Sequence, residues 1–267
     1  MRPWQRECAD RAANARFMVM ALHRRAGKTE LALKKLLSSA ARNRLDLPTY
    51  FYVAPQLKQA RAIAWARLKQ MVEPLRVHGA IEVSEVDSLV RFLHNGAVVR
   101  IYGADNPDSM RGVRLDGCVV DEVAQIKPAV WEEILRPALS DRAGWAWFIG
   151  TPKGVNLFSE LFFAAEGREG WARALYTVDD TDALAPSEVA AIRSEMSENA
   201  YAREYLCDFS AAGDDQLISL TDVEQAARRV LTDADIEGMP RVLGVDPARF
   251  GDDRSVIVSR QGLQVFA

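Results

Sequence analysis

Apolar runs of strand length alternate with helical patterns through the first part of the chain. The runs lie at 17–22, 49–55, 97–103, 117–122 and 145–152, and helical periodicity covers about 29–42 and 57–73. Buried strands separated by helices are typical of a parallel sheet that is covered on both faces. The pattern therefore predicts an α/β fold with a mainly parallel β-sheet flanked by helices. Ligands of such sheets bind beside the carboxyl ends of the strands.

The pattern changes near residue 179. Acidic helical segments follow, and after Pro240 short apolar strands return around a polar turn. Two or three short strands cannot bury a core of their own. We therefore expect the C-terminal segment to be the opening of a second domain that this chain does not complete.

Composition allows a sizeable core, because 49% of the 267 residues are hydrophobic. The apolar runs are too short to span a bilayer, and the N-terminus lacks the apolar stretch of a signal peptide. Three widely spaced cysteines favour neither a disulfide framework nor a zinc site. We therefore expect a reduced, intracellular protein without a membrane partner.

Charge is unevenly distributed, although the net charge is only −3. Residues 1–70 contain 15 lysines and arginines but four carboxylates, whereas the rest contains 19 against 33. One face could thus attract phosphates while another repels them. Ordinary solvated helix faces would produce the same counts, so charge alone argues neither for nor against a nucleic-acid partner.

The segment ALHRRAGKTELALKKLL, residues 21–37, contains a candidate phosphate-binding loop. Gly-Lys-Thr follows an apolar strand and precedes an amphipathic helix, as in the P-loop, but Leu22 replaces its first glycine. In P-loops, backbone amides and the lysine bind phosphates and the hydroxyl binds Mg²⁺. The alternative is a lysine that merely begins a surface helix. The predicted nucleotide-binding residues of the loop are Arg24, Arg25, Ala26, Gly27, Lys28 and Thr29.

The segment CVVDE, residues 118–122, places two carboxylates at the end of an apolar strand. Asp121 would hold Mg²⁺ together with Thr29, and Glu122 would polarise the attacking water. Exposed Asp-Glu pairs at strand ends are also common without a function. Behind a phosphate loop in an α/β pattern, however, the pair predicts ATP hydrolysis.

These segments resemble the large terminase subunit of tailed bacteriophages, the DNA-packaging motor, whose phosphate loop also commonly lacks the first glycine. Arg24 matches the family's loop arginine, which implies contact with the γ-phosphate. The resemblance implies a P-loop ATPase domain over 1–178, an acidic helical linker over 179–237, and the beginning of an RNase H-like nuclease domain over 238–267.

Three further residues match family segments. Arg111 would be a finger that reaches a neighbouring subunit's nucleotide, with Arg114 as the second choice and a local ion pair to Asp105, Asp108 or Asp116 as the alternative. Thr151, in GTPKG, would sense the γ-phosphate, unless the segment is a plain turn. Gln5, in RPWQ, would read adenine, although a polar helix start explains it nearly as well.

The segment GVDPARFGDDRSVIV, residues 244–258, resembles the start of the terminase nuclease. Asp246 would be one ligand of a site for two Mg²⁺ or Mn²⁺ ions, which needs further carboxylates. Asp252 and Asp253 follow nearby, and a hairpin turn is the alternative reading. Because the later carboxylates of that domain are expected beyond Ala267, we predict no nuclease activity from this polypeptide alone.

The resemblance implies a motor that uses ATP and Mg²⁺ to drive double-stranded DNA into a procapsid. The implied partners are the portal protein, the small terminase subunit and further copies of the chain in a ring, with a monomer in isolation. The implied location is the cytoplasm of a bacterial host. A helicase-like translocase and an inactive prophage remnant that only binds partners are the alternatives.

Overall fold

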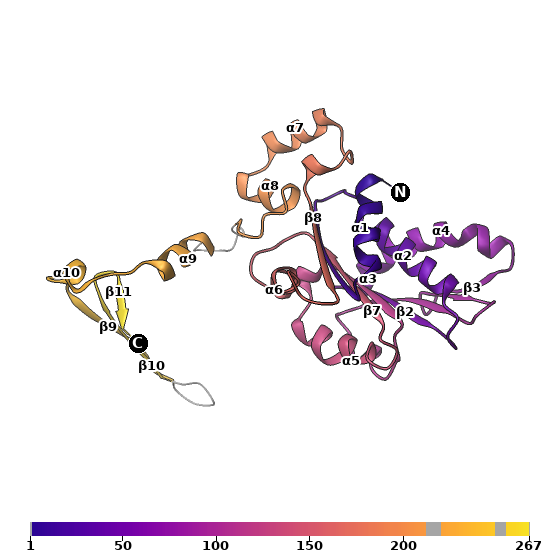
Figure 1. Cartoon of the computed structure of the whole chain (residues 1–267), viewed down its shortest axis with the longest axis horizontal. Helices are drawn as coiled ribbons and strands as arrows, with labels where there is room; N and C mark the ends of the chain where they lie inside the picture. The colour runs from indigo at the N-terminus through magenta and orange to yellow at the C-terminus, as the bar shows by residue number, and fades with distance from the viewer. Residues whose placement is uncertain (1, 212–219, 249–254, 267) are drawn as a thin grey trace. The chain divides into compact units, whose positions relative to one another are not determined.

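The structure is a computed structural model that describes residues 2–211, 220–248 and 255–266. The chain forms two compact units, Met1–Leu217 and Ile218–Ala267 (Figure 1). Residues of the predicted linker, 179–237, fall in both units, and the functional division into three parts stays a prediction.

The first unit is built on an eight-stranded sheet of order β3-β4-β5-β2-β6-β7-β1-β8. Six neighbouring strands are parallel: β5 (Val98–Gly103), β2 (Thr49–Ala54), β6 (Gly117–Asp121), β7 (Trp145–Gly150), β1 (Phe17–Leu22) and β8 (Trp171–Tyr176). Strands β3 (Ile81–Ser84) and β4 (Leu89–Phe92) extend one edge in antiparallel fashion. The predicted mainly parallel sheet is confirmed, while β3, β4 and β8 were not predicted.

Helices cover both faces of this sheet (Figure 1). One face carries α1 (Pro3–Ala13), α2 (Lys28–Arg42) and a helical stretch formed by α3 (Leu57–Ala60), the π-helical η1 (Arg61–Trp65) and α4 (Ala66–Val77). The other carries η4 (Val130–Leu135), α5 (Arg136–Ala138) and α6 (Leu157–Ala164). Short 3₁₀ turns are η2 (Pro107–Met110), η3 (Val123–Gln125) and η5 (Val178–Asp180).

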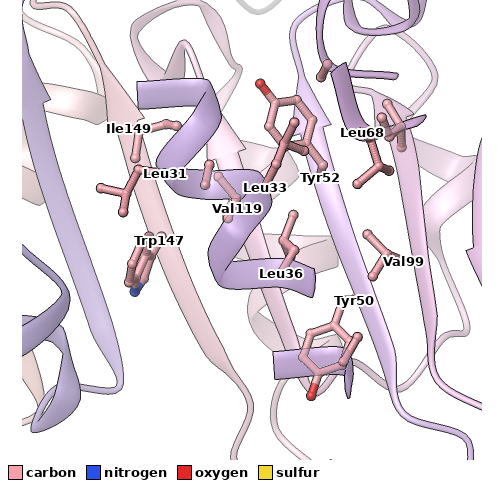
Figure 2. Packing of buried hydrophobic residues seen from close by; sticks show 14 of the residues in the cluster. Leu31, Leu33, Leu36, Tyr50, Tyr52, Leu68, Val99, Val119, Trp147 and Ile149 are labelled. Carbon is pink, nitrogen blue, oxygen red and sulfur yellow. The ribbon is translucent and has the colours of Figure 1, made fainter. Parts of the chain in front are cut away.

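Alternate residues of each central strand enter opposite core layers. In β2, Tyr50 and Tyr52 pack on the α2 side, whereas Phe51 and Val53 pack on the opposite side. Figure 2 shows α2 lying along this layer, with Leu33 and Leu36 directed into it. The central strands are mostly apolar because both of their faces are buried.

Two further helices of the first unit, α7 (Pro186–Glu195) and α8 (Glu198–Tyr205), share a small core of their own with Val178 of η5. Tyr201 and Tyr205 of α8 are buried in it, and their stacked rings have centroids 5.4 Å apart. The side chain of Ser197 accepts a hydrogen bond from the backbone amide of Ala200, which caps the start of α8.

The second unit contains α9 (Leu220–Arg228), α10 (Asp233–Ile236) and an antiparallel sheet of β9 (Arg241–Asp246), β10 (Val256–Gln261) and β11 (Gln264–Phe266). Leu243 and Ile257 each remain 69% exposed, in keeping with a sheet too small to bury a core. Asp252 and Asp253 lie outside the described residues. Among the helices that the structure describes, none has the length and apolar character needed to cross a membrane.

Candidate functional site

Three adjacent strands of the first unit end at one edge of the sheet and bring several predicted site residues together. Strand β7 lies between β6 and β1, and all three run parallel. Asp121 ends β6, Thr151 directly follows β7, and the loop after β1 leads to Lys28 at the start of α2. The candidate site therefore lies at the carboxyl edge, where parallel α/β sheets bind ligands.

The loop between β1 and α2 shows why its first position does not need glycine. Leu22 is buried and extended, as the last residue of β1. Positive φ angles occur instead at Arg25, with 69°, and at Gly27, with 97°. Glycine adopts such angles without the steric cost that a side chain imposes. The glycine that the backbone requires is thus the one directly before Lys28.

Lys28 is the centre of the site. Its ammonium donates a hydrogen bond to Thr151 Oγ1 at 2.9 Å and lies 3.1 Å from Glu122 Oε1. The side chains of Lys28 and Glu122 are only 13% and 26% exposed, so water screens their attraction incompletely. Glu122 has a left-handed backbone, with φ of 51°, which is uncommon for a residue with a side chain. Strained backbone of this kind is concentrated at functional sites.

Asp121 is buried and hydrogen-bonded through both carboxylate oxygens. Its Oδ1 accepts the backbone amide of Glu122 at 2.9 Å, and its Oδ2 accepts the hydroxyl of Tyr52. Burial raises the pKa of Asp121 and the negative charge of Glu122 raises it further, whereas the Lys28 ammonium lowers it. A cation bound beside this buried carboxylate would favour its ionised form.

The available donors fit Mg²⁺ held jointly with a nucleotide. The predicted oxygen ligands are the carboxylate of Asp121 at the end of β6 and the hydroxyl of Thr29 in the first turn of α2. Within the part of the chain that the structure describes, no three His, Cys, Asp or Glu side chains form a metal cage. Mg²⁺ in phosphate sites usually takes one or two protein oxygens together with substrate phosphates and water. Thr29 and Asp121 could supply those protein oxygens.

The phosphate loop also contacts the region after β8 through hydrogen bonds and an ion pair. The backbone amide of Arg24 donates to the carbonyl of Glu204 in α8 at 2.8 Å, and the two side chains form an ion pair at 3.5 Å. Buried His23 contacts the carbonyl of Arg24 at 2.7 Å and Thr181 Oγ1 at 2.6 Å through its two ring nitrogens. Burial lowers the pKa of His23, which favours the neutral ring. Arg24 therefore contacts α8 although its side chain is 64% exposed, and Arg25 is exposed as well.

A cavity of about 420 Å³ lies beside the loop, next to the start of α1. Buried Gln5 donates to the carbonyl of Gly27 at 3.4 Å, and Arg2 donates to the carbonyl of Ala26 at 3.0 Å. The volume is within the range of small-ligand sites. Hollows of about 840 and 860 Å³ are lined by α4 and by the end of α2, away from the three strand ends that carry the site residues.

Two predicted arginines of the first unit, Arg111 and Arg114, lie outside the Lys28 cluster, and Asp246 belongs to the second unit. Arg111 is 52% exposed and pairs with Asp108 at 2.7 Å and with Glu133 at 3.7 Å, so the local ion pair of the alternative reading is present. Arg114 is exposed in the same loop. Asp246 is the last residue of β9 in the second unit, opposite Val256 in the strand register.

Sequence patterns did not reveal three residues that contact the site. Tyr52 lies in an apolar strand, His23 lies in the phosphate loop at a position that was given no role, and Glu204 has no motif around it. Their partners lie far along the chain, with separations of 69 residues for Tyr52 and Asp121 and 158 for His23 and Thr181. No short-range signal could have identified them.

Comparison with known proteins assigns the family. The family described as "Terminase large subunit, T4likevirus-type, N-terminal" matches residues 20–225, which include the phosphate loop, the carboxylate pair and Thr151. The chain belongs to the terminase large subunit family. The resemblance inferred from the sequence is thereby confirmed.

Named relatives agree with this family. The large terminase subunit of Thermus virus P23-45 is 34% identical over 191 residues, which are 65% of this chain and 38% of the relative. The large terminase ATPase domain of Thermus phage P74-26 has a TM-score of 0.64 and 25% identity, and the match covers 74% of this chain and 92% of that structure. A large terminase from a thermophilic bacteriophage, solved in complex with ADP, shares the fold, with a TM-score of 0.67, 16% identity and coverage of 78% and 53%. The match to this terminase chain thus covers well under half the length of the P23-45 relative.

Proposed function

We propose that this chain hydrolyses ATP as the motor portion of a phage DNA-packaging terminase. The observation that carries the proposal is the convergence of Lys28, Glu122 and Thr151 beside the buried Asp121. Membership of the terminase family supports nucleotide as the ligand, as does the fold shared with the thermophilic-phage terminase that was solved with ADP.

In this proposal, phosphate oxygens replace Glu122 as the partner of the Lys28 ammonium. Thr29 and Asp121 would hold Mg²⁺, which would supply positive charge beside the phosphate oxygens. Glu122, released from Lys28, accepts a proton from the attacking water and orients it. Thr151 accepts a hydrogen bond from Lys28 in this structure. In the proposal, loss of the γ-phosphate changes this contact and thereby shifts the segment after β7.

The loop and the cavity beside it would position the rest of the nucleotide. Arg24 leaves its ion pair with Glu204 to reach the γ-phosphate, and Arg25 adds a second guanidinium. The backbone amides of Ala26 and Gly27 bind phosphate oxygens. Gln5 lines the cavity and would read the adenine edge.

Loss of the lysine tests nucleotide binding. We expect Lys28→Ala to weaken the binding of a fluorescent ATP analogue by about 10–100-fold, because it removes charge-assisted hydrogen bonds to phosphate. Lys69→Ala is the matched control, since Lys69 pairs with Glu85 outside the site. Equal affinity in Lys28→Ala and wild type, measured by equilibrium titration, would contradict the phosphate assignment.

Duplex DNA tests the motor role. We expect double-stranded DNA to stimulate steady-state ATP hydrolysis with little sequence preference and to lose this effect as salt rises, because phosphate contacts release counterions. The portal protein, the procapsid, the small terminase subunit and a ring of further copies are the proposed partners. ATP turnover that ignores DNA at every salt concentration would contradict the motor role while leaving ATP hydrolysis intact. Strand separation without a procapsid would favour a helicase instead.

A further inference from the structure

Tyr52 is a buried tyrosine whose hydroxyl group reaches the candidate site from the core. It lies in β2, and 2% of the residue is exposed. The hydroxyl donates a hydrogen bond to Asp121 Oδ2 on the neighbouring strand β6. The phenol thus contacts one of the two residues proposed to hold Mg²⁺.

The contact restrains Asp121 at the oxygen that the backbone does not hold. Oδ1 accepts the amide of Glu122 at 2.9 Å, so the Tyr52 hydroxyl supplies the second donor. Two donors on different oxygens fix the rotation of the carboxylate, and each oxygen keeps a lone pair for another partner. Partners of this kind orient metal ligands, and their loss typically lowers metal affinity or activity by about 10–100-fold.

Packing alone does not explain the hydroxyl group. Tyr52 lies in the apolar layer that contains Leu33 and Leu68, where phenylalanine would fill nearly the same space. A buried hydroxyl needs a hydrogen-bond partner, which an apolar ring does not. The oxygen of Tyr52 therefore has a role that its ring does not provide.

Tyr50 provides an internal comparison on the same strand and the same face of the sheet. Its hydroxyl bonds with Asn43 Nδ2 at 2.7 Å and with the carbonyl of Ser39 at 3.3 Å, near the end of α2. Figure 2 shows the two rings along one strand, with their hydroxyl groups directed toward opposite ends of α2. Tyr50 therefore stabilises the end of a helix, whereas Tyr52 contacts Asp121, a residue of the candidate site.

We propose that Tyr52 is a positioning residue that holds Asp121 in the orientation needed for Mg²⁺. This inference rests on the proposed ATP site and adds a residue to it. The ring of Tyr52 contributes to the core, and its hydroxyl couples metal binding to nucleotide binding.

The test is the coupling between Mg²⁺ and a non-hydrolysable ATP analogue. The dissociation constant of the analogue is measured in EDTA and in saturating Mg²⁺ for wild type, Tyr52→Phe and Tyr50→Phe. We expect Tyr52→Phe to leave the EDTA value within about twofold and to reduce the tightening by Mg²⁺ by about 10-fold or more. Tyr50→Phe keeps the wild-type tightening, and thermal unfolding checks that both variants are folded.

A double-mutant cycle separates positioning from a general packing effect. In an Asp121→Asn background, Tyr52→Phe is expected to cause little further loss of Mg²⁺ coupling, because the carboxylate that it orients is absent. Unchanged coupling in Tyr52→Phe, or an equal loss in Tyr50→Phe, would overturn the proposal. Failure of the wild type to bind the analogue in saturating Mg²⁺ would instead reject the ATP site itself.

Discussion

Glu122→Gln is expected to reduce steady-state ATP hydrolysis by about 10²–10⁴-fold, the usual contribution of a general base. The amide keeps the size of the side chain but cannot accept the proton of the attacking water. ATP binding should persist or strengthen, because the change removes a negative charge that lies 3.1 Å from the Lys28 ammonium. Phosphate release measures turnover, and titration with a fluorescent ATP analogue measures binding.

The matched control for this variant is Glu85→Gln. Glu85 also loses its charge in that change, but it pairs with Lys69 and Trp65 away from the strand ends of the site. We expect wild-type turnover from it. If Glu122→Gln hydrolysed ATP at a rate within a few-fold of wild type, another residue would have to be the group that activates the water. If it lost binding together with turnover, Glu122 would instead be needed for the structure of the site.

The central strands could be predicted because both of their faces are buried. Strand β1 is predicted at its observed bounds, since every residue from Phe17 to Leu22 is apolar and buried. Strand β8 lies at the edge of the sheet and includes Arg173, and the short β3 includes the exposed Glu82. Edge strands leave positions in contact with water, so no continuous apolar run marks them.

The site could be predicted only as far as local motifs extend. Lys28 and Glu122 were predicted because each follows an apolar strand in a recognisable pattern, and the structure brings their side chains into contact. Tyr52 could not be found, because its contact depends on β2 lying beside β6, with Tyr52 opposite Val119. Strand order and register arise from packing over the whole sheet, and they are not encoded in a short segment.

Arg111→Ala is expected to lower ATP turnover by about 10³–10⁵-fold in assembled protein, the range for an arginine finger. Nucleotide binding should remain, because Arg111 lies outside the Lys28 cluster of its own chain. Its local ion pair with Asp108 cannot account for such a loss, since exposed pairs contribute only about 0–1 kcal/mol to stability. Turnover measured over a range of protein concentrations should depend on assembly in the wild type and remain low in the variant.

Mixing two inactive variants distinguishes a finger acting between subunits from one acting within a subunit. An Arg111→Ala chain keeps Glu122, and a Glu122→Gln chain keeps Arg111, so a head-to-tail ring of both restores about a quarter of its interfaces. Turnover should therefore reappear on mixing, although each protein alone is inactive. Arg114→Ala, an exposed arginine in the same loop, is the control and should retain activity. Loss of turnover in Arg114→Ala with normal turnover in Arg111→Ala would assign the finger role to Arg114. Only the arginine that reaches the neighbouring nucleotide can stabilise the transition state of its hydrolysis.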